Sequence, residues 1–203
     1  MFMSESLAAN RVDAVRNRGA ILDAAVEVLA DTPTASLAEI AKRAGLGRAT
    51  LYRHFENREA LGAAIRSEAL DRAASALEAA AVEEGPAREA VHRVVLALLP
   101  LGMRFRVILY GGVDGDAEFV AAREQVLQPL MGLIARAIGN DELDAQVDPV
   151  WIAAALPALL VAAVRVASSG SLDVERTADL LCRTLFDGLG SAKRAAPDLQ
   201  ADS

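Results

Sequence analysis

Apolar residues recur at intervals of three to four positions along most of this 203-residue chain. That interval is the period of one face of an α-helix. Runs of four to eight residues in which apolar and polar positions alternate, which would indicate β-strands, do not occur. The pattern therefore predicts an all-α fold.

Three helices are predicted in the N-terminal part. The first runs from about residue 13 to residue 30 and ends before Pro33. Ser36 and Glu39 have the spacing of a capping box, in which the two side chains satisfy backbone donors at a helix start. Gly45 is suited to end this second helix, because glycine adopts the left-handed conformation without strain. A short third helix follows directly.

The third helix has two distinct faces. At about 100° per residue, Leu51 and Phe55 share one face, and we expect them to pack inward against the first two helices. The opposite face carries Ala49, Thr50 and Arg53. Two short helices joined by a tight turn form the helix-turn-helix arrangement, which places its second helix in the DNA major groove.

Six further helices are expected after this motif. Their approximate ranges are 57–82, 87–99, 103–110, 117–138, 149–168 and 173–189. Pro100 and Gly102 are expected to end the second of them, and Pro129 is expected to kink the fourth.

The predicted helix 149–168 is apolar on nearly every side. Its uncharged stretch from Trp151 to Val164 is shorter than the roughly 20 residues that a membrane span requires. A soluble helix of this kind needs cover on several sides. We therefore expect a partner subunit, and not a membrane, to cover it.

The charge of the chain is unevenly distributed. The formal net charge is −7, but residues 1–60 hold eight basic and eight acidic residues, so the whole negative excess lies after residue 60. The basic residues of the first part also cluster near the third helix. Because the local field governs attraction to phosphates, the acidic total does not exclude DNA binding by this part.

Cysteine and histidine usage excludes several kinds of site. With Cys182 as the only cysteine, an intrachain disulfide cannot form, which fits a reducing cytoplasm. His54 and His92 lie too far apart for a zinc-ligand pattern. The sequence offers no nucleophile–base pair, metal cluster or phosphate loop. We therefore expect neither an enzyme nor a cofactor, and the N-terminus does not have the pattern of a signal peptide.

The candidate DNA contacts gather on and around the third helix. Residues on its outer face reach base edges, and those on its flanks meet phosphates. Backbone N–H groups at the start of the second helix favour an anion. The full set is Ser36, Lys42, Arg43, Arg48, Ala49, Thr50, Tyr52, Arg53, His54 and Arg58. For Lys42 and Arg43 a solvated helix face is the alternative interpretation.

These segments carry a resemblance to a known family. The residues concerned are Ile21–Ala25, Glu39–Ala41, Ala44–Phe55 and Arg58–Leu61, and together they strongly resemble the TetR family of transcriptional regulators. The resemblance covers about residues 16–65. The chain has Gly47 where many members have serine, which removes one hydroxyl that would otherwise be available to DNA.

The resemblance implies a homodimer that binds a palindromic operator, usually as a repressor, and releases it when a small molecule binds the C-terminal part. The implied interface consists of the helices 149–168 and 173–189. We expect a flexible leader at 1–10, a helix-turn-helix DNA-binding domain at 11–60, a ligand-binding and dimerisation domain at 61–190, and a disordered tail at 191–203. The long fourth helix joins the two domains.

A cavity for the unknown effector is expected to be mostly apolar with a few polar groups. The candidate lining residues are Met103, Phe105, Leu109, Tyr110, Phe119, Met131 and Trp151. Ordinary core packing is the alternative for each. Tyr110 and Trp151 are favoured because each carries a polar group.

Three rival functions stay open at this point. The first is a DNA-binding protein without a small-molecule effector, the second is a helical enzyme, and the third is a lipid-carrying bundle that has lost DNA binding. Ligand screening by thermal shift separates the first from our interpretation, and turnover identifies the second. Salt-dependent binding to DNA excludes the third.

Overall fold

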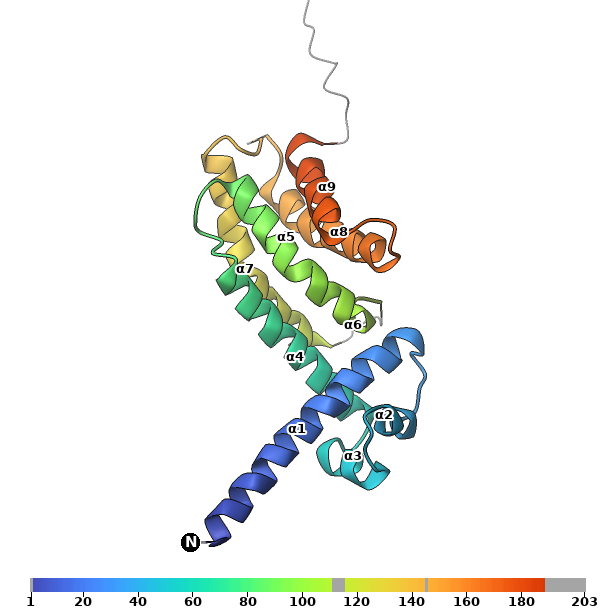
Figure 1. Ribbon diagram of the computed structural model, residues 1–203. Helices are drawn as coiled ribbons and strands as arrows, with labels where there is room; N and C mark the ends of the chain where they lie inside the picture. Colours follow the sequence, from blue (N-terminus) through green and yellow to red (C-terminus); the bar gives the residue numbers. More distant parts are fainter. Residues whose placement is uncertain (1, 111–115, 145, 189–203) are drawn as a thin grey trace, which may run out of the picture.

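The computed structural model describes residues 2–110, 116–144 and 146–188, and of residues 2–11, 109 and 110 only the backbone. Within these ranges the regular structure is helical throughout, which confirms the all-α prediction (Figure 1). The helices are α1 (Phe2–Asp31), α2 (Leu37–Arg43), α3 (Arg48–His54), α4 (Arg58–Ala79), α5 (Ala87–Arg104), α6 (Arg106–Tyr110), α7 (Ala117–Gly139), α8 (Pro149–Ser168) and α9 (Val174–Asp187).

A small head is formed by α1, α2, α3 and the start of α4. Its centre consists of the fully buried side chains of Ile21, Ile40 and Leu51. Asn57 caps α4, since its Oδ1 accepts a hydrogen bond from the backbone N–H of Ala60 at 2.8 Å. From there α4 runs out of the head and along the C-terminal bundle (Figure 1).

The C-terminal bundle is built around α5. This helix packs against α4, α7, α8 and α9, and α8 also packs on α9. Val95, Leu99, Leu133 and Val164 are almost completely buried at its centre. The hydrophobic face of α5 is therefore covered on several sides, as burial of apolar surface requires.

The core of the head does not stop at residue 60, where we expected its boundary. Phe105, Ile108 and Phe119 belong to the same buried cluster as the head residues. The start of α4 contributes Leu61 and Ile65 to it. The head and the C-terminal bundle thus share apolar contacts where they meet.

Two expectations about helix ends were wrong. The first helix begins at Phe2 and not near residue 13, so it includes most of the segment 1–10 that we expected to precede it. No proline or glycine occurs between Phe2 and Val12 to stop it. The predicted tail 191–203 lies outside the described residues.

The helix expected to end at Pro100 continues to Arg104. The proline ring removes one backbone donor, but Pro100 is exposed, so water can replace the missing partner. The chain breaks at Phe105 instead, between α5 and α6. Pro129 lies inside α7 as expected.

Candidate nucleic-acid interface and effector cavity

The turn between α2 and α3 has a well-defined geometry. Gly45 adopts a φ of +69°, in the left-handed region, and the N–H of Leu46 donates to the carbonyl of Ala41 at 2.9 Å. The N–H of Gly45 donates to the carbonyl of Lys42 at 3.2 Å. This pair of bonds ends α2 and directs the chain into α3.

The inner face of α3 anchors it to the head, as predicted. Leu51 is completely buried and Phe55 is 3% exposed, and both pack in the head cluster with Ile21 and Ile40. On the outer side Ala49 and Arg53 are exposed, and Tyr52 is 54% exposed. A rigidly held helix with a polar outer face is the form that reads a major groove.

The capping box at the start of α2 is present. The N–H of Ser36 donates to Glu39 Oε2 at 2.7 Å, and the N–H of Glu39 donates to Ser36 Oγ at 3.3 Å. Glu39 Oε2 also accepts a hydrogen bond from the Ser36 hydroxyl at 2.7 Å, and the two bonds that it accepts from Ser36, backbone first, lower the pKa of the Glu39 carboxyl. The backbone N–H and the hydroxyl of Ser36 are therefore committed within the protein.

The basic candidates separate into two groups. Arg43 pairs with Glu27 at 2.5 Å, and Arg58 donates to the backbone carbonyls of Ala35 and Pro33. Lys42, Arg48 and Arg53 form no ion pair within the described part of the chain. The second group is free to neutralise phosphates, whereas Arg58 holds the loop between α1 and α2.

Thr50 and His54 are the two half-buried candidates on α3. The ring of His54 lies 6.5 Å from the ring of Phe55, centroid to centroid. Both side chains lie at the border between the head core and the outer face, so contact with DNA and packing are compatible for each of them.

A mostly apolar cavity of about 430 Å³ lies between α7 and α8. The last turn of α5 reaches it at Gly102, and Arg123 and Glu124 supply its polar groups. The apolar lining residues are Leu127, Leu130, Met131, Ala153, Leu156, Pro157, Leu160, Val161 and Val164. This volume and composition suit a small organic ligand.

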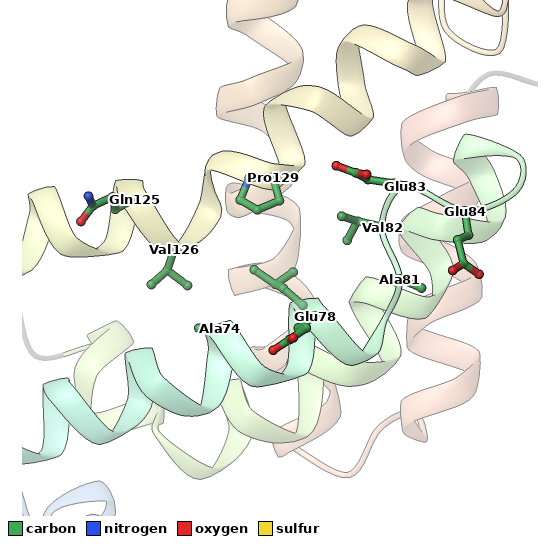
Figure 2. Close-up of a pocket in the computed structure, with 10 residues that line it drawn as sticks. Ala74, Glu78, Ala81, Val82, Glu83, Glu84, Gln125, Val126 and Pro129 are labelled. Atoms are coloured by element: carbon green, nitrogen blue, oxygen red, sulfur yellow. The ribbon is translucent and has the colours of Figure 1, made fainter.

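A more open groove of about 760 Å³ lies between α4 and α7 (Figure 2). Val126 and Pro129 line it from α7, Val82 lines it from the segment after α4, and Glu78 stands on its α4 side. The wide opening to solvent makes it a weaker candidate for burying a ligand than the cavity between α7 and α8.

Most of the predicted lining residues lie elsewhere. Of the five predicted residues whose side chains the structure describes, Met131 lines the cavity between α7 and α8 and the other four do not. Phe105 and Phe119 are buried in the head cluster, because they lie where the two cores meet. Met103 packs against the core of the bundle.

Trp151 is 70% exposed and lines neither the cavity nor the groove. It lies in the first turn of α8. The side chains of Leu109 and Tyr110 lie outside the described residues. The described apolar lining of the cavity is aliphatic, with Leu, Val, Ala, Pro and Met side chains, whereas the predicted set was largely aromatic.

Sequence reasoning missed the ion pairs at the end of α5. Arg104 pairs with Asp23 of α1, and Arg106 pairs with Asp31 of α1 at 2.8 Å. The guanidinium of Arg104 also lies 5.4 Å from the centroid of the Phe105 ring. No sequence signal indicated these pairs, because their partners are about 80 residues apart in the chain.

The outer side of α8 is uncovered in the single chain. Val150 is 75% exposed and Val166 is 37% exposed. By length and hydropathy, α8 is the one helix in the described part that meets the requirements of a membrane span, and 28% of its apolar window is buried. Such a helix alone is weak evidence for a membrane, since helices that pack in soluble proteins meet the same requirements.

The contacts of the histidine and the cysteine in the bundle are those of residues that stabilise the fold. His92 Nε2 lies 3.1 Å from a carboxylate oxygen of Asp179. Cys182 is buried, and its burial raises the pKa of the thiol to about 11. In the described ranges, no group of three or more His, Cys, Asp and Glu side chains is placed to hold a metal ion.

Comparison with known proteins gives a consistent result. Residues 21–65 match the family model described as bacterial regulatory proteins, tetR family. Over 175 residues the chain is 32% identical to the HTH-type transcriptional repressor LfrR of Mycolicibacterium smegmatis, covering 86% of this chain and 90% of LfrR.

Solved structures agree with this match. The crystal structure of LfrR from Mycobacterium smegmatis in complex with proflavine superposes with a TM-score of 0.74 at 31% identity, covering 87% of this chain and 98% of LfrR. PfmR from Thermus thermophilus, a TetR family regulator, gives a TM-score of 0.72 at 22% identity, covering 84% of this chain and 99% of PfmR. The second likeness concerns the fold alone.

Proposed function

Because the chain belongs to the TetR family of bacterial regulatory proteins, whose members regulate transcription and are not enzymes, we propose that it is a homodimeric repressor of a palindromic operator. A small molecule bound in the C-terminal bundle releases it from DNA. The observation that carries this proposal is α3, which is anchored by Leu51 and Phe55 and presents Arg48, Tyr52 and Arg53 to solvent. We place its action in the cytoplasm.

Binding to duplex DNA is the first test. The probe is a fluorescent duplex that spans the region upstream of the protein's own gene, with duplexes selected from a random library as a second source. We expect tight binding that weakens steeply with salt, because phosphate contacts release counterions. A protein that prefers none of these duplexes over a scrambled one does not have the proposed function.

Dimerisation through α8 and α9 is supported by the uncovered apolar side of α8. Exposed Val150, Trp151 and Val166 would gain cover from a second copy. Two-fold symmetry then presents two α3 helices to successive major grooves, about 34–36 Å apart or a multiple of that distance. Light scattering should give twice the 21.3 kDa of the chain.

We propose the cavity between α7 and α8 as the effector site. LfrR has been crystallised with proflavine, and the cavity here combines an apolar lining with one acidic and one basic side chain, Glu124 and Arg123. The apolar lining suits a flat aromatic ligand, and the two charged side chains suit polar substituents on it. Proflavine itself is a practical probe, because its fluorescence changes on binding.

The site can be tested with a matched pair of variants. Ala153→Trp fills the cavity between α7 and α8, whereas Ala74→Trp obstructs the groove between α4 and α7. We expect the first variant to lose proflavine binding and the second to retain it. The reverse result would move the effector site to the groove.

We propose that the end of α5 transmits the signal. Gly102 lines the cavity, and two residues later Arg104 pairs with Asp23 in the head. A ligand that prefers one arrangement of this turn shifts the population of head orientations by its differential affinity for the two states. The long helix α4, which contributes to both cores, tilts with the head.

A further inference from the structure

An arginine outside the helix-turn-helix lies against the end of the recognition helix. The guanidinium carbon of Arg18, on α1, lies 5.3 Å from the centroid of the Phe55 ring. Phe55 is the residue that ends α3, and its ring is almost fully buried. A cation over an aromatic face is attracted by the ring, so the charge of Arg18 is held next to the C-terminal end of α3.

The side of α1 on which Arg18 stands explains this position. At about 100° per residue, Arg18 shares a face with Leu22 and Ala25, which are buried against the rest of the head. Arg16 stands on the opposite face of the same helix, and it is exposed as well. Arg18 therefore faces α3, and Arg16 faces away from it.

Arg18 forms no recorded ion pair in the part of the chain that the structure describes. It is exposed, and in the described part of the chain its recorded interaction is the one with the Phe55 ring. In the same head, Arg43 instead pairs with Glu27, and Arg58 donates hydrogen bonds to loop carbonyls. Arg18 thus belongs with Arg48 and Arg53 among the cations available to a phosphate.

The dimensions of α3 place this charge near the wall of a groove. Seven residues of helix are about 10 Å long, close to the roughly 12 Å width of the major groove. When α3 occupies the groove, a group at its C-terminal end approaches the sugar–phosphate backbone. Phosphate contacts of this kind fix the orientation of a reading helix.

We propose that Arg18 is a further DNA-contacting residue, which binds a backbone phosphate and is held for this contact by the ring of Phe55. The proposal rests on the proposed function, since it requires that α3 enters the major groove. It adds to the helix-turn-helix a contact from α1, and it assigns Phe55 a second role besides core packing.

The test measures the salt dependence of DNA binding. The probe is the duplex of highest affinity that the wild-type protein selects from a random library. Arg18→Met removes the charge but keeps an apolar stem that can pack on the ring. We expect the slope of log K against log salt concentration to fall by about 0.9 for each bound head, while the melting temperature of the protein stays near that of the wild type.

Two further variants make the result specific. Arg18→Lys restores a positive charge, and we expect it to restore most of the slope. Arg16→Met makes the same change of charge on the opposite face of α1, and we expect the wild-type slope. An unchanged slope in Arg18→Met would overturn the proposal even if the affinity fell, because that is the result of a purely structural role.

An equal fall of the slope in Arg16→Met would also overturn it, because the effect would then be one of general charge. The proposed function fails by a different outcome. If the wild-type protein selects no duplex, both the proposed function and the Arg18 contact are contradicted. If the wild-type protein binds a duplex and the slope is unchanged in Arg18→Met, only the Arg18 contact is contradicted.

Discussion

Arg104, in the last turn of α5, donates a hydrogen bond to the carboxylate of Asp23 on α1. The pair connects the C-terminal bundle to the head. Gly102 lines that cavity, and Arg106 pairs with Asp31 at 2.8 Å. One short stretch of chain thus contacts both the cavity and α1.

We predict that Asp23→Asn combined with Asp31→Asn uncouples effector binding from DNA release. The fold should persist, because exposed ion pairs contribute only about 0–1 kcal/mol each. Operator affinity without effector should stay close to that of the wild type. Allosteric couplings are commonly about 5–150-fold, and we expect the factor by which saturating proflavine weakens operator binding to fall towards 1.

Fluorescence anisotropy of labelled operator, with and without proflavine, gives this factor. Glu68→Gln is a suitable control, because it removes an exposed ion pair with Arg72 within α4 and leaves the junction intact. A wild-type coupling factor in the double variant would show that the two pairs do not transmit the signal.

Local patterns made the DNA-binding part predictable. The capping box depends on two residues three positions apart, Ser36 and Glu39, and the faces of α3 follow from the helical period alone. Leu51 and Phe55 are buried as expected. These features need no knowledge of distant parts of the chain.

The cavity could not be predicted in the same way. Whether Phe105 or Leu127 lines it depends on how α5, α7 and α8 are rotated about their axes, and this is settled by packing between segments far apart in sequence. The roles of Arg43 and Arg58 were also hidden, because their partners lie in α1 and in the loop that follows it.

We predict that Tyr52→Phe and Arg53→Ala weaken operator binding without unfolding the protein. On our proposal, Tyr52→Phe loses a hydroxyl that contacts a phosphate, and Arg53→Ala loses hydrogen bonds to a base, which are worth about 1–3 kcal/mol when bidentate. Arg43→Ala should cost less than Arg53→Ala, because Arg43 is paired with Glu27. Affinities come from gel shift or anisotropy, and wild-type affinity in both Tyr52→Phe and Arg53→Ala would remove α3 from the interface.

We predict that Leu51→Ala lowers the free energy of unfolding by about 2–5 kcal/mol. Leu51 is completely buried, so the variant loses apolar contacts and leaves a cavity in the head. Arg53→Ala, on the exposed side of the same helix, should leave stability within about 0.5 kcal/mol of the wild type. Urea unfolding followed by circular dichroism compares the two, and equal stabilities would contradict the inner position of Leu51.

We predict that the free energy of unfolding falls as the pH rises from about 9 to about 11, because of the ionisation of Cys182. Burial raises the pKa of its thiol to about 11 from the ordinary value of 9.0. In this interval the unfolded chain loses the proton and the folded chain keeps it, so ionisation favours unfolding. Cys182→Ala should reduce this fall, and an identical pH profile in the variant would contradict the prediction.

The same burial makes the thiol slow to react. A disulfide reagent at pH 8 should modify Cys182 in the folded protein far more slowly than in denaturant, because the thiolate is the reactive form and the buried group is inaccessible. Release of the coloured thiolate product measures both rates. Fast modification of the folded protein would show that α9 opens readily from the bundle.

The last prediction concerns Trp151, the single tryptophan of the chain. It is 70% exposed in one copy and lies on α8, which we propose as part of the dimer interface. Dimerisation should therefore shift its emission to shorter wavelength and protect it from iodide quenching. Trp151→Glu should shift the equilibrium towards the monomer, because a carboxylate is costly to bury.

Ser75→Glu, on the exposed side of α4, adds the same charge away from α8 and should leave the mass in light scattering unchanged. If Trp151 stays fully accessible to iodide in the dimer and Trp151→Glu remains dimeric, the interface does not include the first turn of α8. The two α3 helices would then lie at a different distance from each other, and the spacing of the operator half-sites would differ accordingly.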